Sequence, residues 1–334
     1  MDPEQALKTA EETAKAVSKL STITEKIFGP RNTKRQADAD EYSANKKIQI
    51  IRNNPDMDIR FQNGEISIER KKVEELLNNA TRREIVAAVK QEQNIENIID
   101  LAMEEAKYVD DVADEQVDED WIIRFFNIAK DISTEEMQHI WAKILTGEIT
   151  RPSSYSLRTL DILRNMSKSE AEVFQKAIPL ICSDYSKSFI YANTKALEIG
   201  GITYSDILTL EECGLLISSQ AISFTKEVKP KGGTSIVSNG YAIGLIKNTQ
   251  SIGTTNVNIG VFMLTEAGKE LSKIIEKKVN LEYLNFFAKE IYIKYSSEII
   301  SLIFKIDSIE DGRTIGKDDD IIYKYPPNAI LFKG

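Results

Sequence analysis

Residues 118–174 read DEDWIIRFFNIAKDISTEEMQHIWAKILTGEITRPSSYSLRTLDILRNMSKSEAEVF, and they decide the fold of the first half of the chain. The stretch holds both tryptophans and the only histidine. Its apolar residues recur at steps of three and four, which is typical of helices that bury one face. Residues that start and stop helices separate these runs, so the pattern predicts four short helices in succession.

The start and stop residues can be placed individually. Asp118 or Asp120 can cap the first helix, and residues 133–136 (STEE) and 167–170 (SKSE) have the spacing of capping boxes. Gly147 predicts the end of the second helix. Because short connections join these helices, we expect antiparallel neighbours around one core, a central helical array over residues 118–185.

The composition is that of a cytoplasmic protein. The chain has 334 residues, 42% of them hydrophobic, and a net charge of −9, which argues against a surface that is basic throughout. Its first residues lack the pattern of a secretory signal, and no apolar run reaches the roughly 18 residues of a membrane span. Cys182 and Cys213 lie far apart among apolar residues, which predicts buried thiols in a reducing compartment.

Residues 1–117 are predicted to form a helical arm. Residues 2–28 carry a weak apolar stripe of small residues, so this helix needs a partner, either the body of the protein or a second copy. A helix lying on a membrane surface and a disordered segment are the alternatives. Residues 68–109 are charged and helical, and they predict one or two long helices typical of bundles and coiled-coil arms.

Two charged stretches of the arm could have either a functional or a structural role. A basic stretch is either a solvated helix face or a patch that contacts phosphate or a partner; its members are Arg31, Lys34, Arg35, Lys46, Lys47 and Arg52. Residues 110–120 contain seven acidic residues in eleven but lack the pattern of a calcium loop. They are best interpreted as a linker whose acidic end favours the next helix, and a hydrolase using Asp118 and Asp120 is a distant alternative.

No catalytic, cofactor-binding or metal site is predicted. His139 lacks an identifiable nucleophile or substrate partner, which favours a structural role. Arg124, Arg151 and Arg158 could bind an anion together, but salt bridges to acidic neighbours are the preferred interpretation.

Residues 186–280 change to a pattern of short helix, strands and a further helix, which predicts a winged-helix-like α/β domain. Residues 229–240 are predicted to be a hairpin loop, the wing. The helix in the DNA-reading position, residues 202–213, holds acidic residues and neither Lys nor Arg, so it would repel phosphates. The wing offers three candidate contacts, Lys226, Lys229 and Lys231.

Residues 281–334 are predicted to be a helix and strand extension. The fold class expected for the whole chain is α+β and predominantly α, with a helical arm, a central helical array and a winged-helix-like end.

The segments DEDWIIRFFNIAKDIS, EEMQHIWAKILTGEI and RPSSYSLRTLDILRNMSKSEAEVF resemble a bacterial family known as domain of unknown function 2806. PRNTKRQADAD and QEQNIENIIDLA resemble the same family, so the resemblance covers roughly residues 30–280. The family commonly has Gly where this chain has Ser153, and it has no known catalytic residue to carry over. WAKIL and the following helix resemble, more loosely, the alpha class of bacterial abortive-infection proteins, which implies a role in phage defence.

We therefore expect a non-enzymatic bacterial interaction protein that associates with itself, as an oligomer, or with a protein partner in phage defence or as a prophage component. The alternative is a DNA-associated regulator that uses the wing lysines and the basic stretch.

Overall fold

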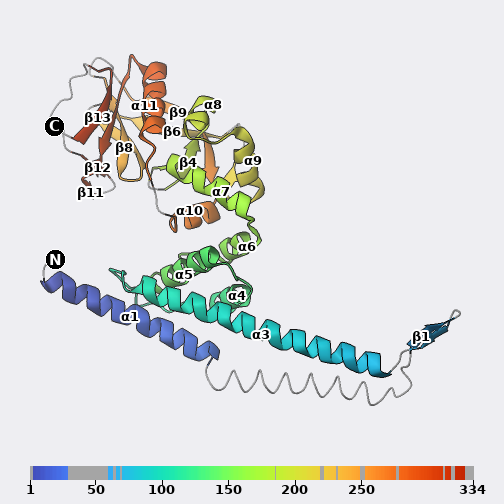
Figure 1. Cartoon of the computed structure of the whole chain (residues 1–334). Helices are drawn as coiled ribbons and strands as arrows, with labels where there is room; N and C mark the ends of the chain where they lie inside the picture. Colours follow the sequence, from blue (N-terminus) through green and yellow to red (C-terminus); the bar gives the residue numbers. More distant parts are fainter. Residues whose placement is uncertain are drawn as a thin grey trace. The chain divides into compact units, whose positions relative to one another are not determined.

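In a computed structural model of the chain, the described residues form two compact units, Met1–Tyr155 (unit 1) and Ser156–Gly334 (unit 2). The described residues are 3–28, 59–62, 65–67, 70–184, 186–218, 222–230, 232–248, 253–275, 278–310, 313–316 and 320–327. Long helices make up most of unit 1, and unit 2 contains a large sheet (Figure 1). The predicted mixture of α and β structure is thereby confirmed. The boundaries of the four predicted segments stay a prediction.

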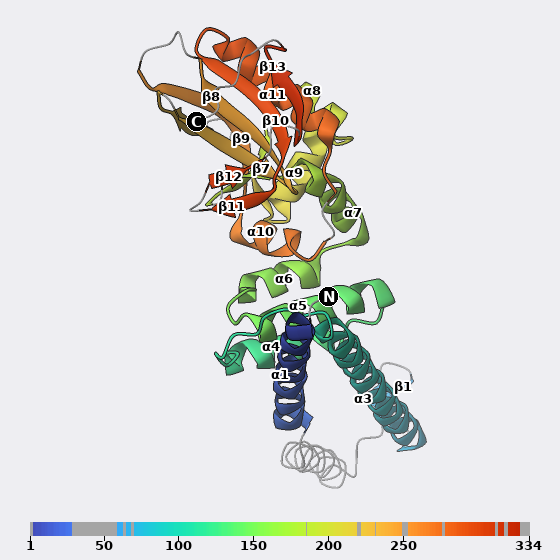
Figure 2. The same cartoon turned by 90° about the vertical axis from the view of Figure 1, so that its left-hand side faces the viewer.

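Unit 1 is built from four described helices and one hairpin. The helices are α1 (Pro3–Phe28), α3 (Arg70–Ala106), α4 (Glu119–Ala129) and α5 (Glu135–Thr150), and strands β1 (Ile59–Gln62) and β2 (Glu65–Ser67) form the hairpin. With neither Gly nor Pro in its 37 residues, α3 runs unbroken. It packs against α1, α4 and α5 (Figure 2).

The core of unit 1 contains an aromatic cluster. Phe125 on α4 is fully buried, and its ring lies 5.1 Å from that of Trp121 and 5.2 Å from that of Trp141 on α5. The indole N–H of Trp121 donates a hydrogen bond of 2.7 Å to the carbonyl of Tyr155. Of the two expected caps, Asp118 is the one that caps α4, accepting from the backbone N–H of Trp121 at 2.9 Å.

The N-terminal helix packs on the body of unit 1, which is one of its expected partners. Leu20 is buried, and two lysines of α1 reach the loop between α3 and α4. The Lys15 amine donates to the carbonyl of Val112 at 2.6 Å, and the Lys19 amine to that of Ala113 at 2.5 Å. Charged hydrogen bonds to backbone carbonyls thus supplement a stripe that is too weak to hold the helix alone.

Two predicted limits of α5 are wrong. Thr134, not Ser133, precedes the helix, and its side chain makes no capping hydrogen bond. Gly147 does not end the helix, which continues to Thr150. A Cβ at Gly147 would lie 2.7 Å from the ring of Tyr155, so this glycine allows close packing instead of a turn.

The sheet of unit 2 has nine strands, paired antiparallel throughout. The order is β13-β10-β8-β7-β3-β4-β9-β5, and β6 also pairs with β9. The strands are β3 (Cys182–Ser183), β4 (Ser188–Tyr191), β5 (Leu216–Ile217), β6 (Ser223–Val228), β7 (Gly233–Ser238), β8 (Tyr241–Lys247), β9 (Thr255–Leu264), β10 (Ile299–Lys305) and β13 (Ile321–Tyr325). A separate hairpin joins β11 (Ser308–Glu310) to β12 (Arg313–Ile315).

Six helices and a 3-10 turn accompany this sheet among the described residues of unit 2. They are α6 (Leu157–Asn165), α7 (Lys168–Ala177), the 3-10 turn η1 (Ile178–Leu180), α8 (Thr194–Ile199), α9 (Tyr204–Glu212), α10 (Glu266–Ser272) and α11 (Leu281–Tyr295). The longest, α11, packs against β10 and β13 (Figure 2). Its buried Tyr283 accepts a hydrogen bond of 2.9 Å from the backbone N–H of Tyr191 on β4.

The sequence predicted that the first two helices of unit 2, α6 and α7, pack with α4 and α5 around one core. Within unit 2 they pack against helices that come later in the chain. α6 packs against α10, and α7 against α9. The Glu270 carboxylate of α10 accepts from the Thr159 hydroxyl at 2.5 Å and from the backbone N–H of Ser156 at 2.8 Å. The capping box of Ser167 and Glu170, by contrast, is present as predicted.

The prediction of a loop over residues 229–240 is wrong, because Gly233–Ser238 within this stretch form β7. A two-residue turn of Asn239 and Gly240, both with positive φ (46° and 82°), connects β7 to β8. Asn-Gly is the preferred sequence for this kind of hairpin turn, because both residues tolerate left-handed backbone conformations. The shorter segment between β6 and β7 contains Lys229.

Among the described residues, no helix is both long enough and apolar enough to cross a membrane.

Candidate partner-binding surface

Helix α9 presents one face to the core and another to solvent. The hydroxyl of Thr203 accepts from the backbone N–H of Asp206, and the Asp206 carboxylate accepts from that of Thr203, which forms a capping box at the start of α9. Ile207 and Leu210 are fully buried beneath the helix. Gly214, with φ +74°, then allows the chain to turn into β5.

The outer face of α9 is apolar where the helix begins. Tyr204 is 44% exposed and Leu208, one turn later, is 41% exposed. Ile217 on β5 is also 44% exposed, and β5 packs beside α9. The Glu211 carboxylate holds the two elements together by accepting from the backbone N–H of Ser218 at 3.1 Å. We call Tyr204, Leu208, Glu212 and Ile217 the α9 surface.

The charge of this face is negative. No Lys or Arg occurs from Ile202 to Gly214. Asp206 serves the capping box, and hydrogen bonds from Ser218 hold the pKa of the Glu211 carboxyl below its ordinary value. Exposed aromatic and aliphatic side chains next to acidic ones suit a protein partner, whereas a phosphate backbone needs positive charge.

The wing lysines differ in their surroundings. Lys226 on β6 lies 3.6 Å from the carboxylate of Asp184, and both side chains are only 14% exposed. Its amine also lies 5.5 Å from the centre of the Phe224 ring. Burial lowers the pKa of Lys226 in spite of the opposing charge of Asp184. Lys226 therefore has little surface left for a phosphate, whereas Lys229 is exposed.

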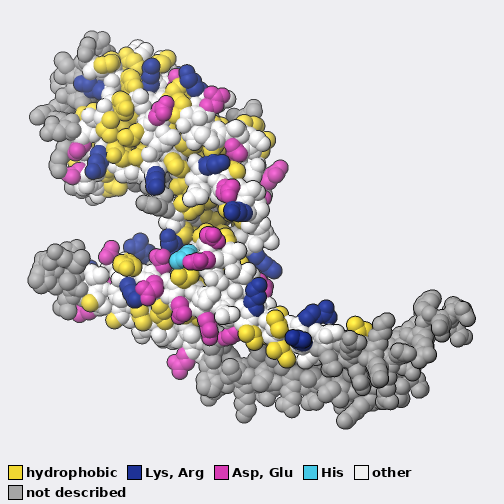
Figure 3. Space-filling view, in the orientation of Figure 1, with side chains coloured by type: hydrophobic (Ala, Val, Ile, Leu, Met, Phe, Trp, Pro, Cys, Tyr) yellow, Lys and Arg dark blue, Asp and Glu magenta, His cyan; other side chains and the backbone are white. Residues whose placement is uncertain are grey.

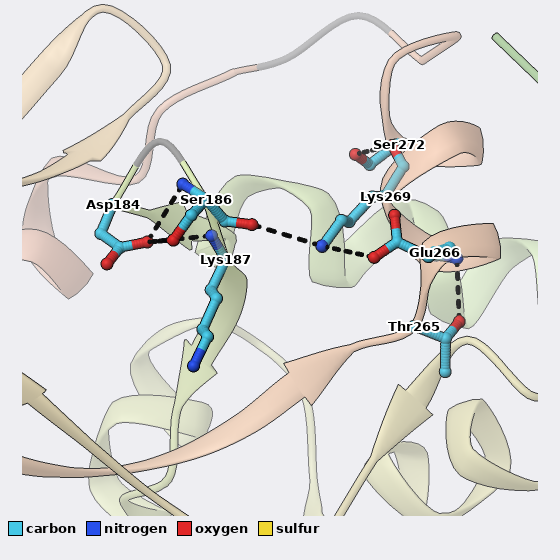
Figure 4. Close-up of polar contacts among 8 residues, drawn as sticks. Asp184, Ser186, Lys187, Thr265, Glu266, Lys269 and Ser272 are labelled. Atoms are coloured by element: carbon cyan, nitrogen blue, oxygen red, sulfur yellow. Dashed lines mark hydrogen bonds and ion pairs between the residues drawn. The ribbon is translucent and has the colours of Figure 1, made fainter. Parts of the chain in front are cut away.

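Asp184 organises the turn between β3 and β4. One of its carboxylate oxygens accepts from the backbone N–H of Lys187 at 2.9 Å and from the Ser186 hydroxyl at 3.0 Å (Figure 4). Lys269 of α10 reaches the same turn, donating to the Ser186 carbonyl at 3.4 Å and to Glu266 at 2.8 Å. The turn, β6 and α10 thus share one network.

This network predicts an acid-dependent contribution to stability. Burial raises the pKa of the Asp184 carboxyl, but the Lys187 N–H, the Lys226 charge and Ser186 outweigh it and lower the pKa overall. A lowered carboxyl pKa stabilises the fold above about pH 4 and ceases to do so as the pH falls through the lowered value. We expect Asp184→Asn to cost about 1 kcal/mol at pH 7 and progressively less as the pH falls below about 4. Urea unfolding of both proteins, followed by circular dichroism at each pH, measures this difference, and a pH-independent difference would contradict it.

The other sequence-predicted residues are not members of the α9 surface. Seven of them lie outside the described residues: Arg31, Lys34, Arg35, Lys46, Lys47, Arg52 and Lys231. His139 is exposed on α5, Arg124 and Arg151 are exposed in unit 1, and Arg158 is exposed in unit 2. Within the acidic run, Asp118 caps α4 and Asp114 pairs with Lys15 at 2.5 Å. Among the described residues, no group of three His, Cys, Asp or Glu side chains could hold a metal ion.

Sequence reasoning missed the exposure of Tyr204, Leu208 and Ile217. The signal was the spacing of Tyr204 and Leu208, which are four residues apart and offset from the buried pair Ile207 and Leu210. Cys182 is buried as predicted, and burial raises its pKa to about 12. Cys213 is only half-buried, because it caps the end of α9.

A family model described as "Protein of unknown function (DUF2806)" matches residues 78–288 of the chain. The matched range begins within α3 and ends within α11, so it includes the α9 surface and parts of both units. No curated protein and no solved structure matches the chain at a significant level.

Proposed function

The chain belongs to DUF2806, a family of proteins of unknown function, and on that premise we propose that it is a non-enzymatic interaction protein of the bacterial cytoplasm. It acts through a protein partner or through a second copy of itself. The observation that carries this proposal is the α9 surface, where Tyr204 and Leu208 face solvent beside acidic residues. The looser resemblance to abortive-infection proteins supports a role in phage defence or on a prophage.

A winged-helix-like arrangement of unit 2 is part of the proposal. It is supported by the chain order α7, β4, α8, α9, β5 and β9, and by the strand order β4-β9-β5. In such a domain α9 takes the place of the helix that reads DNA. Because this helix has no Lys or Arg, the same position serves protein recognition here.

The test is capture of a partner from phage-infected cells by wild-type protein and by a Tyr204→Arg, Leu208→Arg double variant. We expect the variant to bind the captured partner at least about tenfold more weakly, because exposed aromatic anchors near an interface centre dominate affinity. Tyr108→Ala is the matched control, because Tyr108 is 80% exposed in unit 1. It should retain full binding.

The alternative function gives a different result in the same series. A DNA-associated regulator would bind duplex DNA in a salt-dependent manner, and Lys229→Glu with Lys231→Glu would weaken that binding. Wild-type protein that shifts duplex DNA and captures no partner would overturn the proposal. Equal capture by the wild type and the double variant would exclude the α9 surface as the binding site.

A further inference from the structure

The outer part of α3 extends beyond the packed part of unit 1. All ten residues from 81 to 90 are exposed, whereas polar contacts of α3 with the end of α4 begin at Gln91. The Gln91 amide donates to Asp131 at 2.9 Å, and the Asn94 amide donates to the Lys130 carbonyl at 2.8 Å. A helical segment of about ten residues is only marginally stable in water when nothing packs against it. Burial against a partner would therefore stabilise residues 81–90.

The exposed segment carries an apolar stripe. Ile85, Val86 and Val89 are 59%, 61% and 62% exposed, and Ala88 lies between them. On a helix, residues 82, 85, 89 and 92 follow one another at steps of three, four and three, which is the spacing of a coiled-coil seam. Figure 3 shows hydrophobic and basic side chains together along this part of α3. Arg82 and Glu92 therefore flank an apolar centre on the same side of the helix.

We propose that two copies of the chain pair through this stripe, which we call the α3 seam (Arg82, Ile85, Val89 and Glu92), as an antiparallel helix pair. Its two-fold axis passes between Ile85 and Val89, at the height of residue 87 along the helix. Such an axis places Ile85 against Val89 of the second copy. It also places Arg82 against Glu92 of the second copy, and symmetry makes each contact twice. The charge pattern thus matches itself only in the antiparallel direction, because a parallel pair would set Arg82 against Arg82.

The occupant of the stripe follows from this self-complementarity. Arg82 and Glu92 are opposite charges at equal distances from the centre of the apolar stripe. This symmetry is expected for a second copy of the same helix and is not required by a different partner. The stretch from Arg82 to Glu92 that contains the α3 seam has eleven residues and spans only about 16 Å at 1.5 Å per residue, so the interface is small. We therefore expect a micromolar dimer and not a permanent one.

The proposal gives the self-association part of the proposed function a definite surface, and it rests on that function. It is tested by sedimentation equilibrium of the full chain over a range of concentrations. Arg82→Glu should raise the dissociation constant about tenfold or more, because two attractive contacts become repulsive. The double variant Arg82→Glu, Glu92→Arg should restore dimerisation. Ile85→Asp should abolish it, because the charge would be buried opposite Val89.

Arg83→Glu is the matched control. It makes the same change of charge one residue away, but on the opposite side of the helix, so it should leave the dissociation constant within about twofold of the wild type. Circular dichroism verifies that each variant is folded. We expect all of them to fold, because the substituted positions are exposed.

A wild-type chain that stays monomeric, a dimer indifferent to Ile85→Asp, or a double variant no better than Arg82→Glu would each overturn the pairing. Failure of the pairing is distinguishable from failure of the proposed function. Ile85→Asp leaves the α9 surface intact, so partner capture by this variant reports on the proposed function alone.

Discussion

Replacing Phe125 by alanine is expected to lower the free energy of unfolding of unit 1 by about 3–5 kcal/mol. Its ring is fully buried and contacts those of Trp121 and Trp141. Truncation removes buried apolar surface and leaves a cavity among rings that cannot easily rearrange. Because the chain's only two tryptophans lie in this cluster, tryptophan fluorescence during urea unfolding follows unit 1 specifically.

Ile123→Ala is the matched control for this experiment. Ile123 lies two residues away on the same helix but is 57% exposed. Its truncation should change stability by no more than about 0.5 kcal/mol, because exposed side chains contribute little to the core. Similar losses in both variants would mean that the cluster is not the core of unit 1.

Much of unit 1 could be predicted from the sequence because local patterns determine it. Asp118, one of the two expected caps, caps α4 through a hydrogen bond to a residue three positions later. The apolar spacing over residues 68–109 predicted one or two long helices, and α3 is a single one. Where the prediction from the local pattern was wrong, a contact with a residue farther along the chain determined the structure. Gly147 was predicted to stop α5, but Tyr155 packs against it and the helix continues.

Unit 2 was harder to predict because its contacts are long-range. Thr159 of α6 finds Glu270 on α10, 111 residues later. Strand β7 was hidden by the glycines before it, although Asn239-Gly240 could have indicated the hairpin. β4 and α8 were not predicted either, because both are short.

The candidate surface was predictable only in its charge. The absence of Lys and Arg in α9 is a property of the sequence. The side of α9 that faces solvent is set by the rest of unit 2, which covers Ile207 and Leu210. The local sequence pattern does not predict this covering. Likewise, Lys226 was predicted as a contact residue, but its pairing with Asp184 on another segment is visible only in the structure.

Gly268→Ala is expected to destabilise unit 2 by about 3 kcal/mol. A Cβ at Gly268 on α10 would lie 2.3 Å from the backbone carbonyl oxygen of Leu215, closer than any real contact. That oxygen cannot move away at little cost, because it accepts a hydrogen bond of 3.0 Å from the backbone N–H of Thr265. The Thr265 hydroxyl in turn donates to the Gly214 carbonyl at 2.6 Å. The better helix propensity of alanine, about 1 kcal/mol, offsets only part of this clash.

Gly260→Ala separates this clash from the general effect of adding a methyl group. Gly260 is exposed on β9, and the nearest atom to its added Cβ would be 3.9 Å away, on Ala192. We expect this variant to match or slightly exceed the wild type, because alanine loses less backbone entropy on folding than glycine. In urea unfolding followed by circular dichroism, Gly268→Ala alone should lose structure at a lower urea concentration than the wild type. The unfolding midpoint of unit 1, measured by tryptophan fluorescence, should not change. A wild-type unfolding curve for Gly268→Ala would contradict the close packing of α10 against the segment that links α9 to β5.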